Sequence, residues 1–245
     1  RPEKAGDPTV LARFEREVRA TAKLSHWNSI DIYDYGRTAD GTFYYVMEYL
    51  ENGSLEDMVR SQGSLSVSAA SKMLQEIAEG LSYAHEKGVL HCDLKPANVL
   101  LARDGRGIVP KITDFGLAGL AGQFAGAEVR AGTPAYMAPE QFQGRRIDPR
   151  VDIFALGVVL FELVSGARLY ARENEAATMH AILGEPVPRL KSDRVPEAVD
   201  EILQRALAKA PADRYATAFE IMETRDLHHL PVVDPQGDVV GILTR

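Results

Sequence analysis

Two short motifs carry the side chains that are best suited to chemistry. One is HCDLKPAN at residues 91–98, between a predicted helix and a predicted strand, and the other is DFG at residues 114–116, after the next predicted strand. Both motifs supply carboxylate or amide oxygens, which are hard ligands that suit Mg²⁺. A capped loop with self-satisfied side chains explains an isolated Asp or Asn, but it explains this ordered set poorly.

Taken together, the two motifs resemble the catalytic loop and the magnesium-binding motif of protein kinases. This resemblance implies that Asp93 accepts the proton of a substrate hydroxyl and that Lys95 lies against the phosphate in transfer. It also implies that Asn98 and Asp114 hold Mg²⁺. Phosphoryl transfer needs little covalent help from the protein, so such a site works by positioning ATP and the acceptor and by neutralising charge.

The resemblance extends to the class of acceptor. The sequence DLKP at residues 93–96 is similar to Ser/Thr kinases, whereas tyrosine kinases usually place other residues there. The expected reaction is that of a non-specific serine/threonine protein kinase, which transfers the γ-phosphate of ATP to Ser or Thr hydroxyls of protein substrates. The alternative is a pseudokinase or a nucleotide-sensing scaffold. Intact Asp93, Asn98 and Asp114 argue against it, because a scaffold has no chemical need for all three.

Further matches lie downstream of these motifs. Residues 132–140, GTPAYMAPE, look like the end of an activation segment, in which Thr133 would support the catalytic aspartate. In that family Glu140 would pair with a distant arginine, for which Arg214 is the matching position. Asp152 matches an aspartate of the central buried helix that braces the catalytic loop, with an ordinary acidic residue in a first helical turn as its alternative. The supporting positions are His91, Phe115, Gly116, Thr133, Glu140, Asp152 and Arg214.

The nucleotide pocket has a weaker signature. Residues 46–53, VMEYLENG, resemble a strand that leads into the interlobe hinge, with Met47 as gatekeeper and the backbone of Glu48 and Leu50 facing adenine. Any edge strand ending in Asn-Gly looks similar, so this prediction depends on its place before the catalytic loop. Glu17 best matches the glutamate that pairs with the ATP-binding lysine, and Glu15 is the alternative. The positions assigned to ATP are Glu17, Met47, Glu48, Leu50, Lys95, Asn98, Leu100 and Asp114.

The ATP-binding lysine itself has no match in this chain. In the family it precedes the paired glutamate by about 19 residues, which would put it before Arg1. No Gly-rich loop that would cover the phosphates precedes the first predicted helix either. We therefore expect an incomplete smaller lobe, and we expect this segment alone to bind ATP weakly and to be inactive.

The elements that position these residues follow from the pattern of apolar residues. Asp7 and Pro8 are typical of an N-cap and first helical position, and they begin an amphipathic helix of about four turns. Strand patterns at residues 30–35 and 42–49 predict an antiparallel hairpin. The other predicted elements are a helix over 68–87 that stops at Gly88, strands over 99–102 and 110–113, and helices over 151–164 and 196–208.

Strands come first in this chain and helices follow, which indicates an α+β or two-lobed architecture. The resemblance implies a protein-kinase-like two-lobed fold over residues 1–222, with an incomplete N-terminal lobe and a mostly helical C-terminal lobe. Residues 223–245 resemble part of a CBS domain, but they lack the acidic residue that this family uses on ribose, so nucleotide binding is not expected there. Either one helix serves both modules or the parent chain is an unusual fusion.

The chain departs from the family at the position usually held by an arginine that reads a phosphate on the activation segment, because Cys92 stands there. Residues 117–131 also contain no Ser, Thr or Tyr. We therefore expect activity that is not switched by phosphorylation of this segment, and phosphate on Thr133 that raised activity would contradict this expectation. A redox role for Cys92 is less expected than a buried, inert thiol.

Composition excludes several other classes. The chain has 28 basic and 35 acidic residues and a net charge of −7, which gives no electrostatic case for binding nucleic acid or an anionic membrane. Its single cysteine allows no internal disulfide, which fits a cytoplasmic location. The most apolar stretch, residues 153–164, is too short to span a bilayer. The sequence carries no sign of an oligomeric state.

Overall fold

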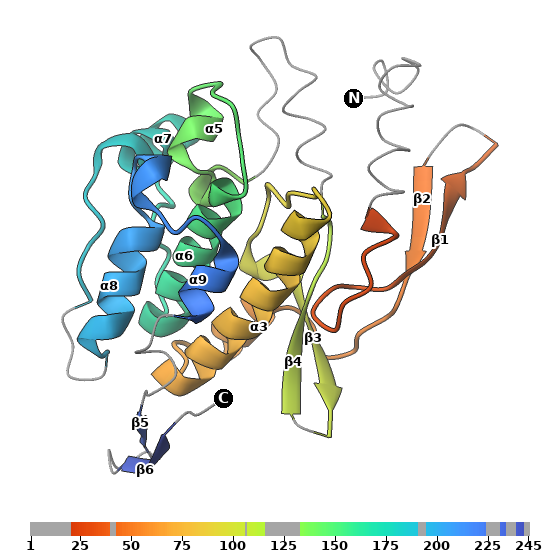
Figure 1. Ribbon diagram of the computed structural model, residues 1–245, viewed down its shortest axis with the longest axis horizontal. Helices are drawn as coiled ribbons and strands as arrows, with labels where there is room; N and C mark the ends of the chain where they lie inside the picture. Colours follow the sequence, from red (N-terminus) through yellow and green to blue (C-terminus); the bar gives the residue numbers. More distant parts are fainter. Residues whose placement is uncertain are drawn as a thin grey trace.

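The computed structural model describes residues 21–39, 43–105, 107–115, 133–190 and 195–223, and the backbone of two strands at 231–233 and 239–242. It has a larger, mostly helical part and a smaller part built on β1 and β2 (Figure 1). In chain order the elements are β1 (Ile32–Arg37), β2 (Phe43–Met47), α2 (Leu55–Gln62), α3 (Val67–Glu86), β3 (Val99–Asp104), β4 (Gly107–Ile112), α5 (Pro139–Phe142), α6 (Arg150–Ser165), α7 (Glu175–Gly184), α8 (Glu197–Ala206), α9 (Ala218–Met222), β5 (Pro231–Val233) and β6 (Val239–Ile242).

The described strands form three antiparallel pairs, β1 with β2, β3 with β4, and β5 with β6. In the first pair Tyr35 lies opposite Tyr45, and in the second Val99 lies opposite Ile112. The predicted hairpin of residues 30–49 and the two strands predicted within residues 99–113 are therefore confirmed, and the two strands pair with each other. This second pair is longer than predicted because its ladder continues to the pair Asp104–Gly107 at the turn.

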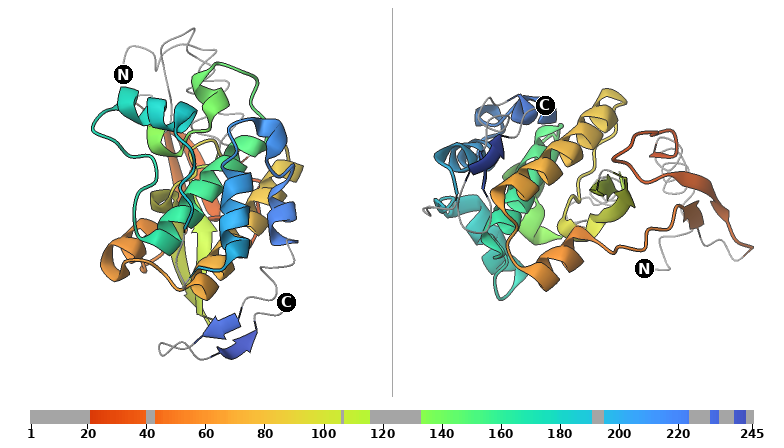
Figure 2. Two further views of the ribbon diagram at one scale, coloured as in Figure 1. Left: turned by 90° about the vertical axis from the view of Figure 1, so that its left-hand side faces the viewer. Right: turned by 90° about the horizontal axis from the view of Figure 1, so that it is seen from below.

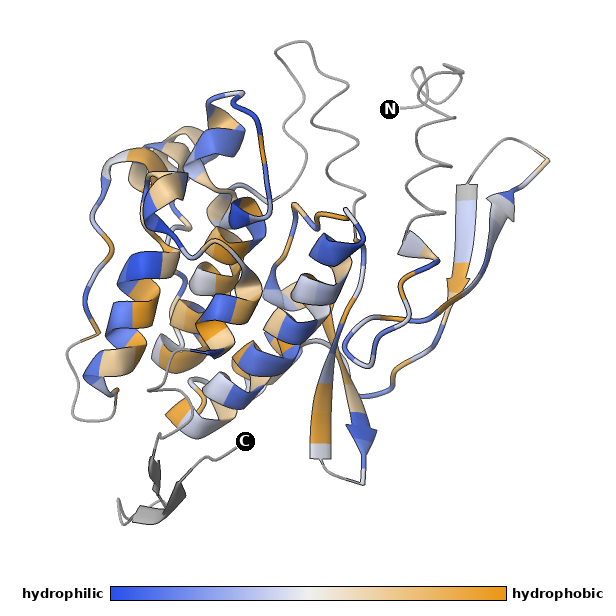
Figure 3. Ribbon diagram, viewed as in Figure 1, coloured by the Kyte–Doolittle hydropathy of each residue, from blue (hydrophilic) through white to orange (hydrophobic). Residues whose placement is uncertain are grey.

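Helix α6 forms the centre of the larger part. Every residue from Val151 to Val164 is buried, as expected for a helix that is apolar on all sides (Figure 3). Gly157 lets α8 approach closely, because a Cβ there would lie 3.0 Å from both Ala206 Cβ and Leu207 Cγ. The predicted helix over 151–164 is thus confirmed, with one more residue at each end.

Helix α3 packs against α6, α9 and β4 and carries the loop that leads into the predicted catalytic motif. It begins at Ser66, whose side chain accepts from Ala69 N, and it ends before Gly88, which has a φ of 74°. That left-handed backbone suits glycine and stops the helix as predicted. Its buried face includes Leu74, Ile77 and Leu81 in the main core.

Several elements differ from the predictions; β1, for example, spans residues 32–37 instead of the predicted 30–35. Helix α2 was not predicted, although its capping box was visible in the sequence: Asp57 N donates to Ser54 Oγ, and Ser54 N donates to Asp57 Oδ2. Helix α8 ends at Ala206, two residues before the predicted end at residue 208. The helix predicted to begin at Asp7 and Pro8 lies outside the described residues.

The pair β1–β2 and the pair β3–β4 are joined by hydrogen bonds between residues just before β1 and the end of β4. Ile30 N donates to Ile112 O at 2.9 Å, and Ile112 N donates to Asn28 O at 2.9 Å. Beyond this junction β1 and β2 extend away from the helices, as both Figure 1 and the right-hand view of Figure 2 show. The region between β2, β4 and the loop after α3 is therefore where the predicted site residues can meet. Within the described ranges, no helix combines the length and the apolar character that crossing a membrane requires.

Candidate active site

The loop between α3 and β3 carries Asp93, whose carboxylate is held through both oxygens. Thr133 donates its backbone N–H to Oδ1 at 2.8 Å, and Lys95 donates from Nζ to Oδ2 at 2.8 Å. Lys95 also donates to Thr133 Oγ1 at 2.8 Å. Asp93, Lys95 and Thr133, from two segments far apart in the sequence, are therefore joined by mutual hydrogen bonds. The Asp93 side chain keeps 17% of its surface exposed, which leaves the carboxylate accessible.

Asn98 ends the short 3₁₀ turn η2 (Pro96–Asn98), directly before β3. Its Nδ2 donates to the Asp93 carbonyl at 2.9 Å and to Asp93 Oδ2 at 3.3 Å. Because the amide nitrogen is used in this way, the amide oxygen is the end of the side chain that can serve another ligand. The turn thus fixes Asn98 beside the same carboxylate that Lys95 holds.

Both predicted motifs contain strained backbone. Cys92 and Asp114 have φ angles of 65° and 61°, and among the described residues they are the only ones other than glycine with positive φ. Such a conformation costs on the order of 1–3 kcal/mol and persists where the surroundings hold it. At Cys92 the N–H donates to Asp152 Oδ1 at 2.8 Å, and the carbonyl accepts from Gln141 Nε2 at 3.3 Å.

Asp152, at the start of α6, holds the loop between α3 and β3 in place through hydrogen bonds to its backbone. It is fully buried, and its Oδ2 accepts from His91 N at 2.9 Å while His85 Nε2 lies 2.7 Å from the same oxygen. Burial favours the protonated carboxyl, but the hydrogen bond and charge of His85, with the contribution of His91, hold the pKa of Asp152 below its usual value. A buried carboxylate that accepts this many donors is a bracing group, because it holds the backbone N–H groups of both His91 and Cys92.

His91 links the two motifs. Burial lowers the pKa of His91 despite the neighbouring carboxylates, so the ring is neutral near pH 7. Its Nε2 donates to Thr113 O at 2.9 Å, and its Nδ1 accepts from Asp93 N at 3.2 Å. The ring also lies 5.0 Å from that of Phe115, centroid to centroid. One histidine therefore sets the relative position of residues 93 and 113–115.

Tyr45 on β2 reaches the second motif, and the sequence analysis missed it. Its hydroxyl donates to Asp114 Oδ1 at 2.7 Å. Burial, followed by the hydrogen bond and charge of Asp114, raises the pKa of Tyr45 to about 12. No motif marks this tyrosine, because the contact joins positions 69 residues apart on separate hairpins. Nearby, Thr113 Oγ1 lies 3.9 Å from Met47 Sδ, which brings the predicted gatekeeper next to the DFG motif.

The predicted hinge residues lie at the end of β2 and after it. The Glu48 side chain accepts from Asp31 N at 2.9 Å and pairs with Lys111, and its backbone N–H donates to Asp31 O at 3.0 Å. The Glu48 carbonyl is therefore the backbone group of this residue that could serve a ligand. Leu50 and Leu100, on neighbouring segments, are half-buried. Glu17 and Gly116, also predicted for the site, lie outside the described residues.

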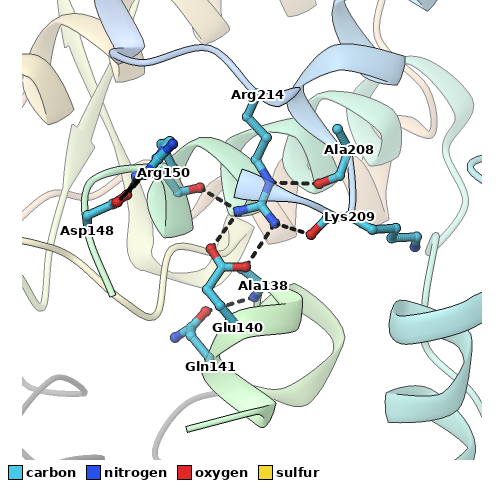
Figure 4. A network of polar contacts seen from close by, with 8 residues as sticks. All are labelled: Ala138, Glu140, Gln141, Asp148, Arg150, Ala208, Lys209 and Arg214. Carbon is cyan, nitrogen blue, oxygen red and sulfur yellow. Dashed lines mark hydrogen bonds and ion pairs between the residues drawn. The ribbon is translucent and has the colours of Figure 1, made fainter. Parts of the chain in front are cut away.

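The predicted activation-segment residues are held to the larger, helical part by buried polar contacts. Arg214 and Glu140 form a buried bidentate ion pair, with 0% and 4% of their side chains exposed (Figure 4). Arg214 Nη1 donates to Glu140 Oε1 at 2.6 Å and Nη2 donates to Oε2 at 2.9 Å. Its remaining three N–H groups donate to the carbonyls of Arg150, Ala208 and Lys209. All five guanidinium donors are thus satisfied, which is the condition under which a buried arginine is tolerated.

A second anchor joins Tyr136 to α6. The Tyr136 hydroxyl donates to Glu162 Oε2 at 2.8 Å, and both side chains are buried. Burial raises the pKa of Glu162, although the hydrogen bond from Tyr136 and the charge of Arg168 oppose this. The folded chain therefore holds the Glu162 proton more tightly than the unfolded chain does. The stability contributed by this group is complete below the unfolded pKa near 4.5 and is lost as pH rises through the higher folded pKa.

Replacing Glu162 by glutamine should remove this pH dependence, because the amide stays neutral throughout. We expect the stability of Glu162→Gln relative to wild type to increase as pH rises above about 4.5, at up to about 1.4 kcal/mol per pH unit. Urea denaturation at several pH values measures this difference. Glu201→Gln, at an exposed position on α8, is the matched control and should show no such trend. A constant difference between Glu162→Gln and wild type from pH 4 to 8 would contradict the raised pKa.

Comparisons with known proteins agree with this geometry. The family model of the protein kinase domain matches residues 2–225, and that of the CBS domain matches residues 210–245. The chain is 36% identical over 219 residues to the serine/threonine-protein kinase PknL of Mycobacterium tuberculosis, covering 88% of this chain and 54% of that protein. It is 34% identical over 223 residues to the serine/threonine-protein kinase pkn3 of Myxococcus xanthus, covering 86% of this chain and 41% of that protein.

A third relative is the serine/threonine-protein kinase PknB of Mycolicibacterium smegmatis, which is 33% identical over 231 residues, or 90% of this chain and 36% of that protein. The chain thus spans about half or less of the length of these curated relatives. The family model nevertheless covers most of the chain, including both chemical motifs, the bracing aspartate and the buried ion pair. The chain therefore belongs to the protein kinase family.

Proposed function

We propose that the protein containing this chain transfers the γ-phosphate of ATP to Ser or Thr hydroxyls of protein substrates. The observation that carries the proposal is the Asp93 carboxylate, which is oriented through both oxygens by Thr133 and Lys95 and is still accessible. In the reaction the acceptor oxygen bonds to the γ-phosphorus, the bond to the ADP oxygen breaks, and Asp93 takes the hydroxyl proton. Lys95 holds the carboxylate in place and supplies positive charge where the phosphate transfers.

The donor set suits Mg²⁺ that arrives with ATP. Asp114 supplies a carboxylate and Asn98 an amide oxygen, and Mg²⁺ is usually bound by one or two such groups together with phosphates and water. Among the described residues there is no cluster of three or more His, Cys, Asp or Glu side chains that could hold a metal. A site completed by the substrate phosphates fits this arrangement better than a closed protein cage. When bound, Mg²⁺ would neutralise charge on the phosphates.

The remaining parts of the proposal concern ATP contacts and regulation. The backbone of Glu48 and Leu50, with Met47 and Leu100, would contact adenine, and Glu17 would pair with the lysine that binds ATP in this family. Control by phosphorylation of the activation segment is not expected. Thr133 supports this view because its hydroxyl is already engaged by Lys95 and its N–H by Asp93. We further propose a division into a kinase part at residues 1–222 and a CBS-like part at 223–245.

The test is phosphate transfer from radiolabelled ATP to a generic protein substrate by the full-length parent protein. We expect label on serine and threonine after acid hydrolysis of the product and none on tyrosine. Chelation of Mg²⁺ by EDTA should abolish transfer, and excess Mg²⁺ should restore it. A folded parent protein that carries the ATP-binding lysine and transfers no phosphate would contradict the proposal and favour the scaffold alternative.

A further inference from the structure

The contact between Tyr45 and Asp114 joins two hairpins that share no sheet. Tyr45 lies on β2, whereas Asp114 follows β4, and the two strand pairs are separate (Figure 1). The 2.7 Å distance from the Tyr45 hydroxyl to Asp114 Oδ1 is in the range of a charge-assisted hydrogen bond between a hydroxyl and a carboxylate. The smaller part of the molecule thus makes a direct hydrogen bond to the aspartate of the DFG motif.

The Tyr45 side chain is half-buried beside the DFG motif. It lines a small pocket together with Ile30, Ile32 and Phe115, and these side chains give the pocket apolar walls. Tyrosine has few rotatable bonds, so holding its ring in this position costs little conformational entropy. The hydroxyl can therefore donate to the carboxylate at little entropic cost.

The backbone of Asp114 has an uncommon conformation. Its φ of 61° is in the left-handed region, and the direction of its side chain depends on what surrounds it. Oδ1 is engaged by Tyr45, and within the described part of the chain no hydrogen bond is made to Oδ2. Among the described residues, one oxygen is thus anchored and the other has no hydrogen-bond partner. Partners of this kind orient metal-binding carboxylates, and their loss typically weakens metal binding by about 10–100-fold.

We propose that Tyr45 is a positioning residue that holds the Asp114 carboxylate through Oδ1, so that Oδ2 can bind the cation carried by the nucleotide phosphates. This inference rests on the proposed function, because it takes Asp114 as a cation ligand. Tyr45→Phe removes the hydroxyl and keeps the ring and the pocket. We expect the affinity for the divalent cation to fall by about tenfold or more, with much less change in the rate at saturating cation.

The test uses Mn²⁺ as the probe, with ADP and the full-length parent protein, and follows bound Mn²⁺ by electron paramagnetic resonance. A parallel measurement gives the Mg²⁺ concentration for half-maximal phosphate transfer. Tyr44→Phe is the matched control, because Tyr44 neighbours Tyr45 on the same strand and is exposed at 42%. Side chains alternate between the faces of a strand, so this variant removes a hydroxyl from the opposite face. We expect it to leave both values unchanged.

Weaker Mn²⁺ binding and a higher Mg²⁺ requirement in Tyr45→Phe alone would support the proposal. Equal affinities in Tyr45→Phe and wild type would overturn it, and so would tighter binding in the variant, which would mean that the hydroxyl competes with the cation. Phosphate transfer by wild type with equal affinities would contradict this inference and leave the proposed function intact. Weaker Mn²⁺ binding in Tyr45→Phe, with no phosphate transfer by wild type, would support this inference and contradict the proposed function. A wild-type protein that binds no Mn²⁺ would contradict the inference and the proposed function alike.

Discussion

Asp93→Asn is expected to lower the rate of phosphate transfer by about 10²–10⁴-fold, the usual contribution of a general base. The amide cannot take the proton of the acceptor hydroxyl. It also presents an N–H group within the set of donors formed by Thr133, Lys95 and Asn98, which now surround the carboxylate. The rate at saturating ATP and protein substrate measures the effect, beside the free energy of unfolding of the same samples.

Asp34→Asn is the control for this change. Asp34 is exposed on β1, where it accepts a hydrogen bond from Tyr35 N, and it lies outside the candidate site. We expect wild-type transfer and nearly wild-type stability from Asp34→Asn, and a modest loss of stability in Asp93→Asn because its amide N–H faces other donors. If Asp93→Asn kept more than about a tenth of the wild-type rate while folded, proton transfer to Asp93 would not be a main part of the mechanism.

Arg214→Met is expected to destabilise the folded chain by about 3–5 kcal/mol, because it leaves the Glu140 carboxylate buried without its partner. The three backbone carbonyls that Arg214 holds would also lose their donors. Arg214→Lys should restore only part of the loss, since an ammonium cannot supply a bidentate fork and five N–H groups. Urea denaturation of each variant measures the free energy of unfolding.

The double variant Arg214→Met with Glu140→Leu separates the cost of an unpaired charge from the value of the pair. Removing both charges should be much less harmful than removing one, because no buried charge remains. Arg60→Ala, which breaks an exposed pair with Asp57 where 75% of the arginine side chain is accessible, should cost less than about 1 kcal/mol. A loss of under about 1 kcal/mol in Arg214→Met would show that the carboxylate finds water or another partner there.

Helices α3 and α6 were the most predictable elements, for a local reason. The 68–87 prediction differs from α3 by one residue at each end, because Ser66 begins the helix and Gly88 ends it through groups that are adjacent in sequence. The hairpin of β1 and β2 was predictable because β-branched and aromatic residues flank turn residues. Helix α2 was missed because its eight residues are too few for a clear apolar period, although the Ser54–Asp57 cap was readable.

The sequence by itself determined the family and led to the residues proposed for the chemistry, because HCDLKPAN, DFG and GTPAYMAPE are local patterns in a fixed order. Only the tertiary structure decided how these residues meet. The interlock of Asp93 with Thr133 spans 40 positions, and the hydrogen bond of Tyr45 to Asp114 spans 69. Such contacts depend on how hairpins and helices pack around a shared core, and burial by distant elements sets the pKa shifts as well. A local sequence pattern contains no information about either tertiary packing or burial by distant elements.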